Sequence, residues 1–136
     1  MTEELLKAYR QALYTVEIPS GVMTLRVGER NEALIELLSQ ENLTDWAYIT
    51  AENPQSKILS QEENAERNAK LESMLKSKNY CFFNGEGRSV DGSWPVEKSF
   101  LVLGILEKEA LDLGQKFQQS AILLGGLTGV PILRFI

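Results

Sequence analysis

The sequence contains no histidine, and this absence limits the chemistry open to the chain. It excludes Ser-His-Asp and Cys-His catalysis, histidine general bases and the usual zinc and iron sites. Any catalysis would have to use carboxylates, lysine, tyrosine, arginine or backbone groups, and any metal would need oxygen ligands. We predict no metal site and no cofactor, and we assign no catalytic residue.

Cysteine and long apolar runs are also scarce. The single cysteine, Cys81, excludes an intrachain disulfide and a cysteine-built zinc site, and its apolar neighbours favour a buried structural thiol over a nucleophile. No run approaches the roughly 18 apolar residues that cross a bilayer, and no signal peptide pattern follows Met1. We therefore expect a cytoplasmic protein.

Basic residues are outnumbered, with 14 Lys and Arg against 19 Asp and Glu and a formal net charge of −5. Nucleic acids and anionic membranes attract basic patches, so we expect neither as a partner. A small local basic pocket and a protein partner both remain open. The length of 136 residues fits one domain, 1–136, in which an N-terminal helix at 2–13 packs onto an α/β core at 14–136.

Residues 46–75 are the most informative stretch, because they have the pattern of a strand, a loop and a helix. Residues 46–50 are β-branched or aromatic, which favours a strand, and Asn53-Pro54 ends it. Ser60 and Glu63 have the spacing of a capping box, in which each side chain bonds a free backbone N–H of the first helical turn. A helix should therefore run from near residue 60 to about residue 77.

The inward face of this helix changes character along its length. Its last turns present leucine and methionine at i, i+3 and i+4, whereas the same stripe in its first turns carries Asn64, Arg67 and Asn68. A buried polar group without a hydrogen bond costs about 1–3 kcal/mol, so these groups need partners. The partners are either a ligand or other protein groups in a structural network, and both interpretations stay open.

The rest of the chain alternates helical and strand-like patterns. The other expected elements are helices at 2–13, 31–39 and 110–117, a hairpin of 15–18 and 22–27, a strand at 80–83, a glycine-rich connecting loop at 84–93, a buried central strand at 99–105 and a terminal hairpin of 121–124 and 132–135. The G-x-G in the loop at 84–93 is weak evidence for nucleotide binding, because no third glycine and no helix follow it.

These patterns predict the fold class. Three strand–helix–strand units can be counted, and such units usually pair their strands in parallel through a right-handed crossover. The hairpins add antiparallel neighbours. We predict an α/β fold, with a mixed α+β fold as the alternative, built on a single mixed parallel and antiparallel sheet with about four helices packed on it.

Several phrases carry a resemblance to a known family. They are ITAENPQS, EENAERNAKLESML, the Trp94-Pro95 segment that leads to Glu97-Lys98-Ser99-Phe100, and the run from Phe117 to Ile122. From about Tyr14 onward the chain resembles the small bacterial domain-of-unknown-function family 3293. That family has no established activity, so the resemblance implies a fold unit and no particular reaction.

The resemblance also implies a set of polar positions. They are Thr50, Asn53, Pro54 and Ser56 in the loop, Asn64, Arg67 and Asn68 on the helix, Glu97 and Ser99 at the central strand, and Gln119 before the next-to-last strand. The chain departs from the family pattern in the spacing from Trp94 to Ser99, which is one residue longer than usual, and at two single positions. Glu52 stands where an aromatic or small residue is expected, and Gln118 stands where glycine is expected.

Three functions are compatible with the sequence. The favoured one is a domain that binds a small anionic or nucleotide-like molecule at the strand–loop–helix of 50–68, because helix N-termini and Arg67 attract negative charge. The second is an enzyme of unfamiliar type in which Glu97 acts as an acid or base, the alternative for Glu97 being an ion pair with Arg67. The third is an interaction or regulatory module with Trp94 as its interface anchor.

Overall fold

The computed structural model describes residues 2–136 and contains seven strands and four α-helices within them. The strands are β1 (Leu13–Ile18), β2 (Gly21–Leu25), β3 (Trp46–Ile49), β4 (Cys81–Arg88), β5 (Glu97–Leu103), β6 (Ala121–Gly125) and β7 (Ile132–Phe135). The helices are α1 (Glu3–Gln11), α2 (Glu32–Glu41), α3 (Gln61–Ser77) and α4 (Glu107–Lys116), and a short 3₁₀ turn, η1 (Pro54–Ser56), precedes α3.

All strands belong to one sheet in the order β2-β1-β4-β5-β3-β6-β7, and every pair of neighbours is antiparallel. The predicted mixed parallel and antiparallel sheet is therefore wrong. Each helical crossover does connect two strands that run in the same direction, but an opposite strand always lies between them. For example, α3 links β3 to β4, and β5 is inserted between those two strands.

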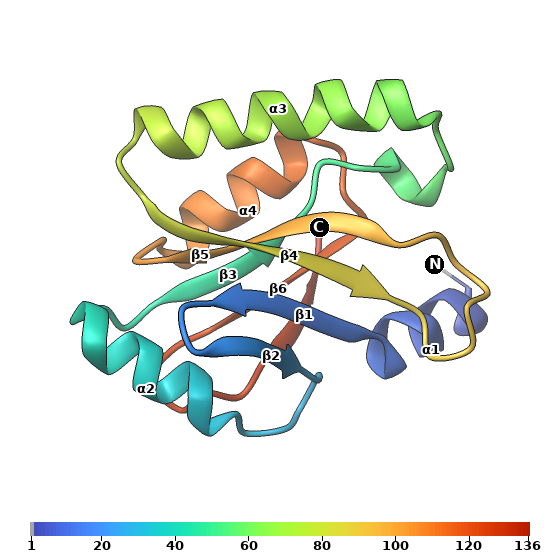
Figure 1. The fold of residues 1–136 in the computed structure, drawn as a ribbon. Helices are drawn as coiled ribbons and strands as arrows, with labels where there is room; N and C mark the ends of the chain where they lie inside the picture. Colours follow the sequence, from blue (N-terminus) through green and yellow to red (C-terminus); the bar gives the residue numbers. More distant parts are fainter. Residues whose placement is uncertain (1) are drawn as a thin grey trace.

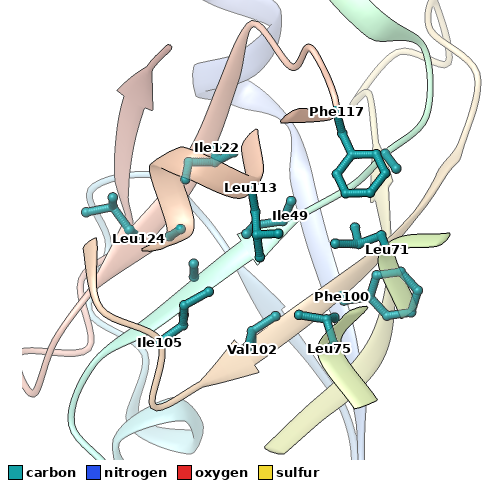
Figure 2. Packing of buried hydrophobic residues seen from close by; sticks show 13 residues of the cluster. Ile49, Leu71, Leu75, Phe100, Val102, Ile105, Leu113, Phe117, Ile122 and Leu124 are labelled. Atoms are coloured by element: carbon teal, nitrogen blue, oxygen red, sulfur yellow. The ribbon is translucent and has the colours of Figure 1, made fainter. Parts of the chain in front are cut away.

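One face of the sheet is covered by α3 and α4 (Figure 1). The side chains of these helices meet the sheet in an apolar cluster that includes Ile49, Leu71, Leu75, Phe100, Val102, Leu113 and Phe117 (Figure 2). Complete burial of one such Leu or Phe contributes about 1.5–3 kcal/mol, so this cluster holds both helices on the sheet. The central position of β5, with Phe100 and Leu101 fully buried, confirms the predicted central strand.

The other face curves around a second apolar cluster. Tyr14, Trp46 and Leu103 from the sheet pack there against leucines of α2. The two edges of the curled sheet approach each other through their loops, because Gly28 N donates to Pro131 O and Asn31 N donates to Gly129 O, each at 2.9 Å. Helix α2 lies at one end of this curved side and α1 at the other (Figure 1).

Most predicted local elements are confirmed. The hairpins β1–β2 and β6–β7 are present, and Ser60 and Glu63 form the predicted capping box at the start of α3. Helix α1 is capped by Thr2, as its sequence indicates, but none of its residues is fully buried. No helix within residues 2–136 combines the length and the apolar composition that a membrane span requires.

The glycine-rich loop predicted at 84–93 is wrong over its first half. Strand β4 continues to Arg88, so Gly85 and Gly87 lie in the sheet and neither has a positive φ. Gly85 is required by close approach, since a Cβ at this position would lie 2.0 Å from Thr15 O. The remaining turn contains Gly92, which has a φ of 74°.

Candidate functional site

The polar face of α3 is bonded to the loop that follows β3. Asn68 accepts a hydrogen bond from Ala51 N at 2.9 Å through Oδ1, and its Nδ2 donates to Lys98 O and to Glu52 Oε2. Ala51 is fully buried, so its backbone N–H has no access to water and needs this partner. Asn68 therefore fixes the loop between the helix and β5.

Asn53 and Asn64 form a reciprocal pair in the same place. Asn53 N donates to Asn64 Oδ1, and Asn64 Nδ2 donates to Asn53 Oδ1, each at 2.9 Å. Asn53 Oδ1 also accepts from Leu59 N at 2.9 Å. Both asparagines are buried, and every fully buried side-chain nitrogen and oxygen within residues 2–136 has a hydrogen-bond partner. These contacts are the ones expected of a structural network.

Arg67 is also used within the protein. Its Nε donates to Ala51 O at 2.6 Å, and its Nη2 donates to Phe117 O. The expected ion pair between Arg67 and Glu97 is wrong, because no salt bridge joins them among the described residues. These bonds use two of the five N–H donors of the guanidinium and fix it to the main chain, and the other three have no partner among residues 2–136.

The loop held by this network has an unusual backbone. Asn53, Gln55 and Ser56 have φ values of 50°, 52° and 61°, and Gln118 beside them has a φ of 58°. Gln55 N donates to Gln118 O at 2.7 Å, which joins the two segments. The left-handed conformation costs a non-glycine residue roughly 1–2 kcal/mol, so the network holds a strained segment in place. Gln118, which stands where the family pattern has glycine, takes a backbone conformation that favours glycine.

Glu97 lies at the start of β5, on the opposite side of this loop. Its Oε2 accepts hydrogen bonds from Asn53 Nδ2 at 2.7 Å and from Trp94 Nε1 at 3.2 Å, whereas its Oε1 has no hydrogen-bond partner among residues 2–136. Burial raises the pKa of the Glu97 carboxyl above its ordinary value, and the bonds from Asn53 and Trp94 oppose that rise. Asn53 thus connects the α3 network to a carboxylate with unused hydrogen-bonding capacity.

Glu97 lines two hollows. Both lie at the end of the curled sheet that is next to α1. The inner hollow, of about 40 Å³, is lined by Tyr9, Tyr14, Tyr48, Thr50, Gly87, Glu97, Ser99, Gln119, Ala121, Ile122, Leu123 and Leu133. The outer hollow, of about 60 Å³, lies against α1 and is lined by Leu5, Ala8, Tyr9, Ala12, Tyr14, Gly87, Arg88, Ser89, Trp94 and Glu97. The two hollows share Tyr9, Tyr14, Gly87 and Glu97.

Five of the polar groups around the inner hollow donate their protons to backbone carbonyls. Tyr14 Oη donates to Tyr9 O at 2.6 Å, and Tyr48 Oη donates to Thr15 O at 2.9 Å. The hydroxyls of Thr50 and Ser99 and the amide nitrogen of Gln119 also donate to backbone carbonyls. The polar part of the lining therefore offers oxygen lone pairs, and Ala121, Ile122, Leu123 and Leu133 form an apolar part.

The predicted site residues fall into two groups. Asn64, Arg67 and Asn68 belong to the network on the α3 side. Thr50, Glu97, Ser99 and Gln119 line the inner hollow, and Trp94 lines the outer one. Asn53 connects the groups, and Ser56 lies beside the hollow, where its Oγ is 3.3 Å from Tyr9 Oη and 3.1 Å from Ser120 Oγ.

Sequence reasoning missed the tyrosines of this site. Tyr9, Tyr14 and Tyr48 come from α1, β1 and β3, and burial raises the pKa of each hydroxyl. It also missed Gly87, which lies opposite Glu97 in the β4–β5 pair. No local pattern distinguishes these residues from ordinary core positions. Within residues 2–136, no three His, Cys, Asp or Glu side chains are grouped to hold a metal ion.

Comparison with known proteins places the chain in a family. No curated protein and no solved structure matches it. A family model matches residues 49–122, more than half of the chain, and that segment runs from the end of β3 to the start of β6. It contains every site residue predicted from the sequence, whereas Tyr9, Tyr14 and Tyr48 lie outside it. The chain therefore belongs to the family described as protein of unknown function (DUF3293).

Proposed function

We propose that this protein binds a small molecule in the inner and outer hollows beside α1, with Glu97 as the anchoring group. The observation that carries the proposal is the asymmetric bonding of the Glu97 carboxylate. Asn53 and Trp94 hold Oε2 at 2.7 and 3.2 Å, while Oε1 has no partner within residues 2–136. Because hydrogen bonds to Oε2 fix the orientation of the carboxylate, Oε1 also has a fixed position. A fixed acceptor can form a directional hydrogen bond with a ligand.

The setting of this carboxylate supports a binding role. The hollows lie at the mouth of a curled sheet, a common location for ligand sites. The strained backbone of residues 53–56 lies directly beside them, and strain of this kind concentrates at functional sites. The α3 network then has a structural role in the site. Asn64 fixes the position of Asn53, and Asn53 fixes the position of the Glu97 carboxylate.

The anionic or nucleotide-like ligand expected from the sequence has weaker support. Arg67 donates to two backbone carbonyls, and the inner hollow is lined by a carboxylate and by oxygen acceptors. An anion placed beside Glu97 would be repelled. In this proposal the ligand lies on the curved side of the sheet. The polar segment at 50–68 does not bind it directly and instead holds Glu97 in position through Asn53.

A substitution that fills the inner hollow tests the proposal. A Cβ at Gly87 would lie 3.9 Å from Glu97 O, Ser99 Oγ and Tyr14 Cδ1, which is ordinary contact. Gly87→Val should therefore fold while occupying the hollow. Asn84→Val is the matched control, because Asn84 is exposed on the same strand.

The measurement is thermal unfolding of the three proteins with a panel of small amines, alcohols, carboxylates and nucleotides. A bound molecule stabilises the folded state by mass action. At least one compound should raise the Tm of the unmodified protein and of Asn84→Val but leave Gly87→Val unchanged. The proposal fails if no compound raises the Tm, or if every compound that does so acts equally on Gly87→Val.

Catalysis by Glu97 is the second candidate, and the raised pKa of its carboxyl favours it. A carboxyl with a raised pKa can hold and release a proton closer to neutral pH, as a general acid or base must. Once a ligand is known, Glu97→Gln separates the two functions. Loss of turnover with retained binding would indicate catalysis, whereas a molecule that is bound and recovered unchanged would indicate binding alone.

The interaction module has less support than either. Trp94 is only half-buried, but its indole N–H is bonded to Glu97 and its side chain lines the outer hollow. These contacts give the Trp94 side chain a structural role within the protein. An interface anchored by Trp94 stays a prediction, which partner recovery with Trp94→Ala would test.

A further inference from the structure

We infer that the ligand of the two hollows is a short primary alkylammonium ion, with its charged head in the inner hollow and its alkyl chain in the outer one. The inference rests on the function proposed above and specifies the chemical class of the ligand. It follows from three features of the hollows, which are the direction of the hydrogen bonds, the sign of the charge and the division between polar and apolar lining.

The hydrogen bonds favour a ligand that supplies protons. The hydroxyls of Tyr14, Tyr48, Thr50 and Ser99 each donate to a backbone carbonyl. The amide nitrogen of Gln119 donates to Glu52 O and Phe117 O in the same way. An ammonium group has three donors and no acceptor, so it complements the lone pairs of these oxygens, whereas a carboxylate or phosphate would add more acceptors.

The charge in the hollows has the matching sign. Among residues 2–136, Glu97 is the only charged side chain that lines the inner hollow. The outer hollow adds Arg88, but its Nη2 is paired with Glu86 Oε1 at 2.9 Å and its side chain is 48% exposed. A cation bound at Glu97 Oε1 would therefore meet a carboxylate that forms no ion pair within residues 2–136, and charge-assisted hydrogen bonds of this type are stronger than neutral ones.

The outer hollow has an apolar lining where it meets α1. Leu5, Ala8, Ala12 and Trp94 are among its lining residues. An alkyl chain attached to the ammonium group would be buried against these side chains at about 0.8 kcal/mol per CH₂. Hollows of about 40 and 60 Å³ have room for only a few non-hydrogen atoms, which selects a short unbranched chain.

The two tryptophans provide a site-specific measurement. The indole N–H of Trp94 donates to Glu97 Oε2, so a cation at Oε1 of the same carboxylate should shift its NMR signal. The indole N–H of Trp46 donates to Gly126 O and serves as an internal reference in every spectrum. The probes are n-butylammonium, 1-butanol and butyrate, which share one chain length and differ in the head group, each titrated at pH 7 to tens of millimolar.

We expect n-butylammonium to shift the Trp94 indole signal saturably, with an affinity at least tenfold higher than that of 1-butanol, and butyrate to have no effect. Gly87→Val should abolish the shift, and Glu97→Gln should weaken butylammonium binding at least tenfold while leaving 1-butanol unchanged. Asn84→Val should behave like the unmodified protein.

Each other outcome has a defined meaning. If 1-butanol or butyrate shifts the Trp94 signal in a Gly87-dependent way and butylammonium does not, the ammonium inference is wrong and the proposed binding function stands. If no compound from this series or the wider panel acts in a Gly87-dependent way, both are wrong. Butylammonium binding that persists in Gly87→Val, or that is equal in Glu97→Gln, would place the cation elsewhere and overturn the inference.

Discussion

Two polar regions of this protein lie on either side of the loop that follows β3. They differ in which of their hydrogen-bonding atoms have a partner within the protein. On the α3 side, Asn64, Arg67 and Asn68 bond to the main chain and side chains of the loop and of its neighbours. On the curved side of the sheet, Glu97 Oε1 has no hydrogen-bond partner within residues 2–136, and the hydroxyls of Tyr14 and Tyr48 donate to backbone carbonyls. Glu52 Oε1 also has no partner within residues 2–136, so the difference lies in the asparagines of α3, which are bonded within the protein, and in Glu97, which lines two hollows beside α1.

This difference separates a structural network from a candidate site. Buried polar groups must be bonded in either case, so their presence alone does not indicate function. The informative quantity is the capacity that remains after the protein's own bonds are formed. Asn53 takes part in both regions, which explains why the family-like residues form one group in the sequence and two groups in space.

The largest effect should come from the α3 network. Asn68→Ala removes the partner of Ala51 N, which is fully buried, whereas Lys98 O keeps its bond from Thr50 Oγ1. We expect the free energy of unfolding to fall by about 2–4 kcal/mol, because the buried N–H left without a bond costs about 1–3 kcal/mol and the truncated buried side chain leaves a cavity. Urea unfolding measures this loss. Lys70→Ala, at an exposed position of the same helix, is the control and should change stability by less than about 0.5 kcal/mol.

A loss below about 1 kcal/mol in Asn68→Ala would contradict the structural role of the network, since a penalty that small is typical of a bond that water can replace. The contrast between the two regions would then disappear. The polar face of α3 would return as a candidate binding surface, and the anionic ligand predicted from the sequence would regain support.

An intermediate effect should separate two glycines of β4. A Cβ at Gly85 would lie 2.0 Å from Thr15 O, whereas a Cβ at Gly87 has no neighbour closer than 3.9 Å. Gly85→Ala should therefore destabilise the fold by about 1–3 kcal/mol, as overpacking usually does. Gly87→Ala should leave stability unchanged or raise it by up to about 1 kcal/mol, because it reduces the freedom of the unfolded chain. Equal losses in the two variants would show that the hollow beside Gly87 is not open.

The smallest effect should be the pH dependence that Glu97 contributes. Burial raises the pKa of this carboxyl above its ordinary 4.5, so the folded state holds the proton more tightly than the unfolded state does. Its stabilising contribution is fully present below that ordinary value and is lost as the pH rises through the raised pKa. Glu97→Gln should flatten the decline in stability across this window, measured by urea unfolding at a series of pH values.

Other groups near Glu97 set the background of that measurement. The carboxyl of Glu52 also has a raised pKa, caused first by burial, and it should leave a residual slope in Glu97→Gln. The hydroxyls of Tyr9, Tyr14 and Tyr48 have raised pKa values and titrate far above this window. An unchanged slope in Glu97→Gln would show that this carboxyl is no more buried than an ordinary surface group.

The elements that sequence reasoning predicted correctly are those set by local rules. The capping box of Ser60 and Glu63 begins α3 at the predicted place, and the apolar run of β5 lies at the centre of the sheet. The two hairpins follow from turn residues between short apolar runs. The glycines of β4 were interpreted wrongly because glycine marks both turns and close approaches of the backbone, and the sequence does not distinguish the two.

The sheet order could not be predicted because a helical crossover determines the relative direction of two strands and leaves their adjacency open. The insertion of β5 between β3 and β4 depends on contacts between segments far apart in the chain. The hollow was missed for the same reason. Tyr9 and Tyr14 reach Glu97 across more than 80 positions of the sequence, and no spacing rule connects them.

The amino-acid sequence by itself determined the helices, the turns, the buried central strand and the list of polar side chains that need partners. Those features depend on interactions between neighbouring residues. Only the tertiary structure decided which of those side chains are satisfied by the protein and which keep a free lone pair. That outcome depends on where backbone carbonyls from distant strands come to lie, and it leaves Arg67 bonded to main chain and Glu97 Oε1 without a partner in the described chain.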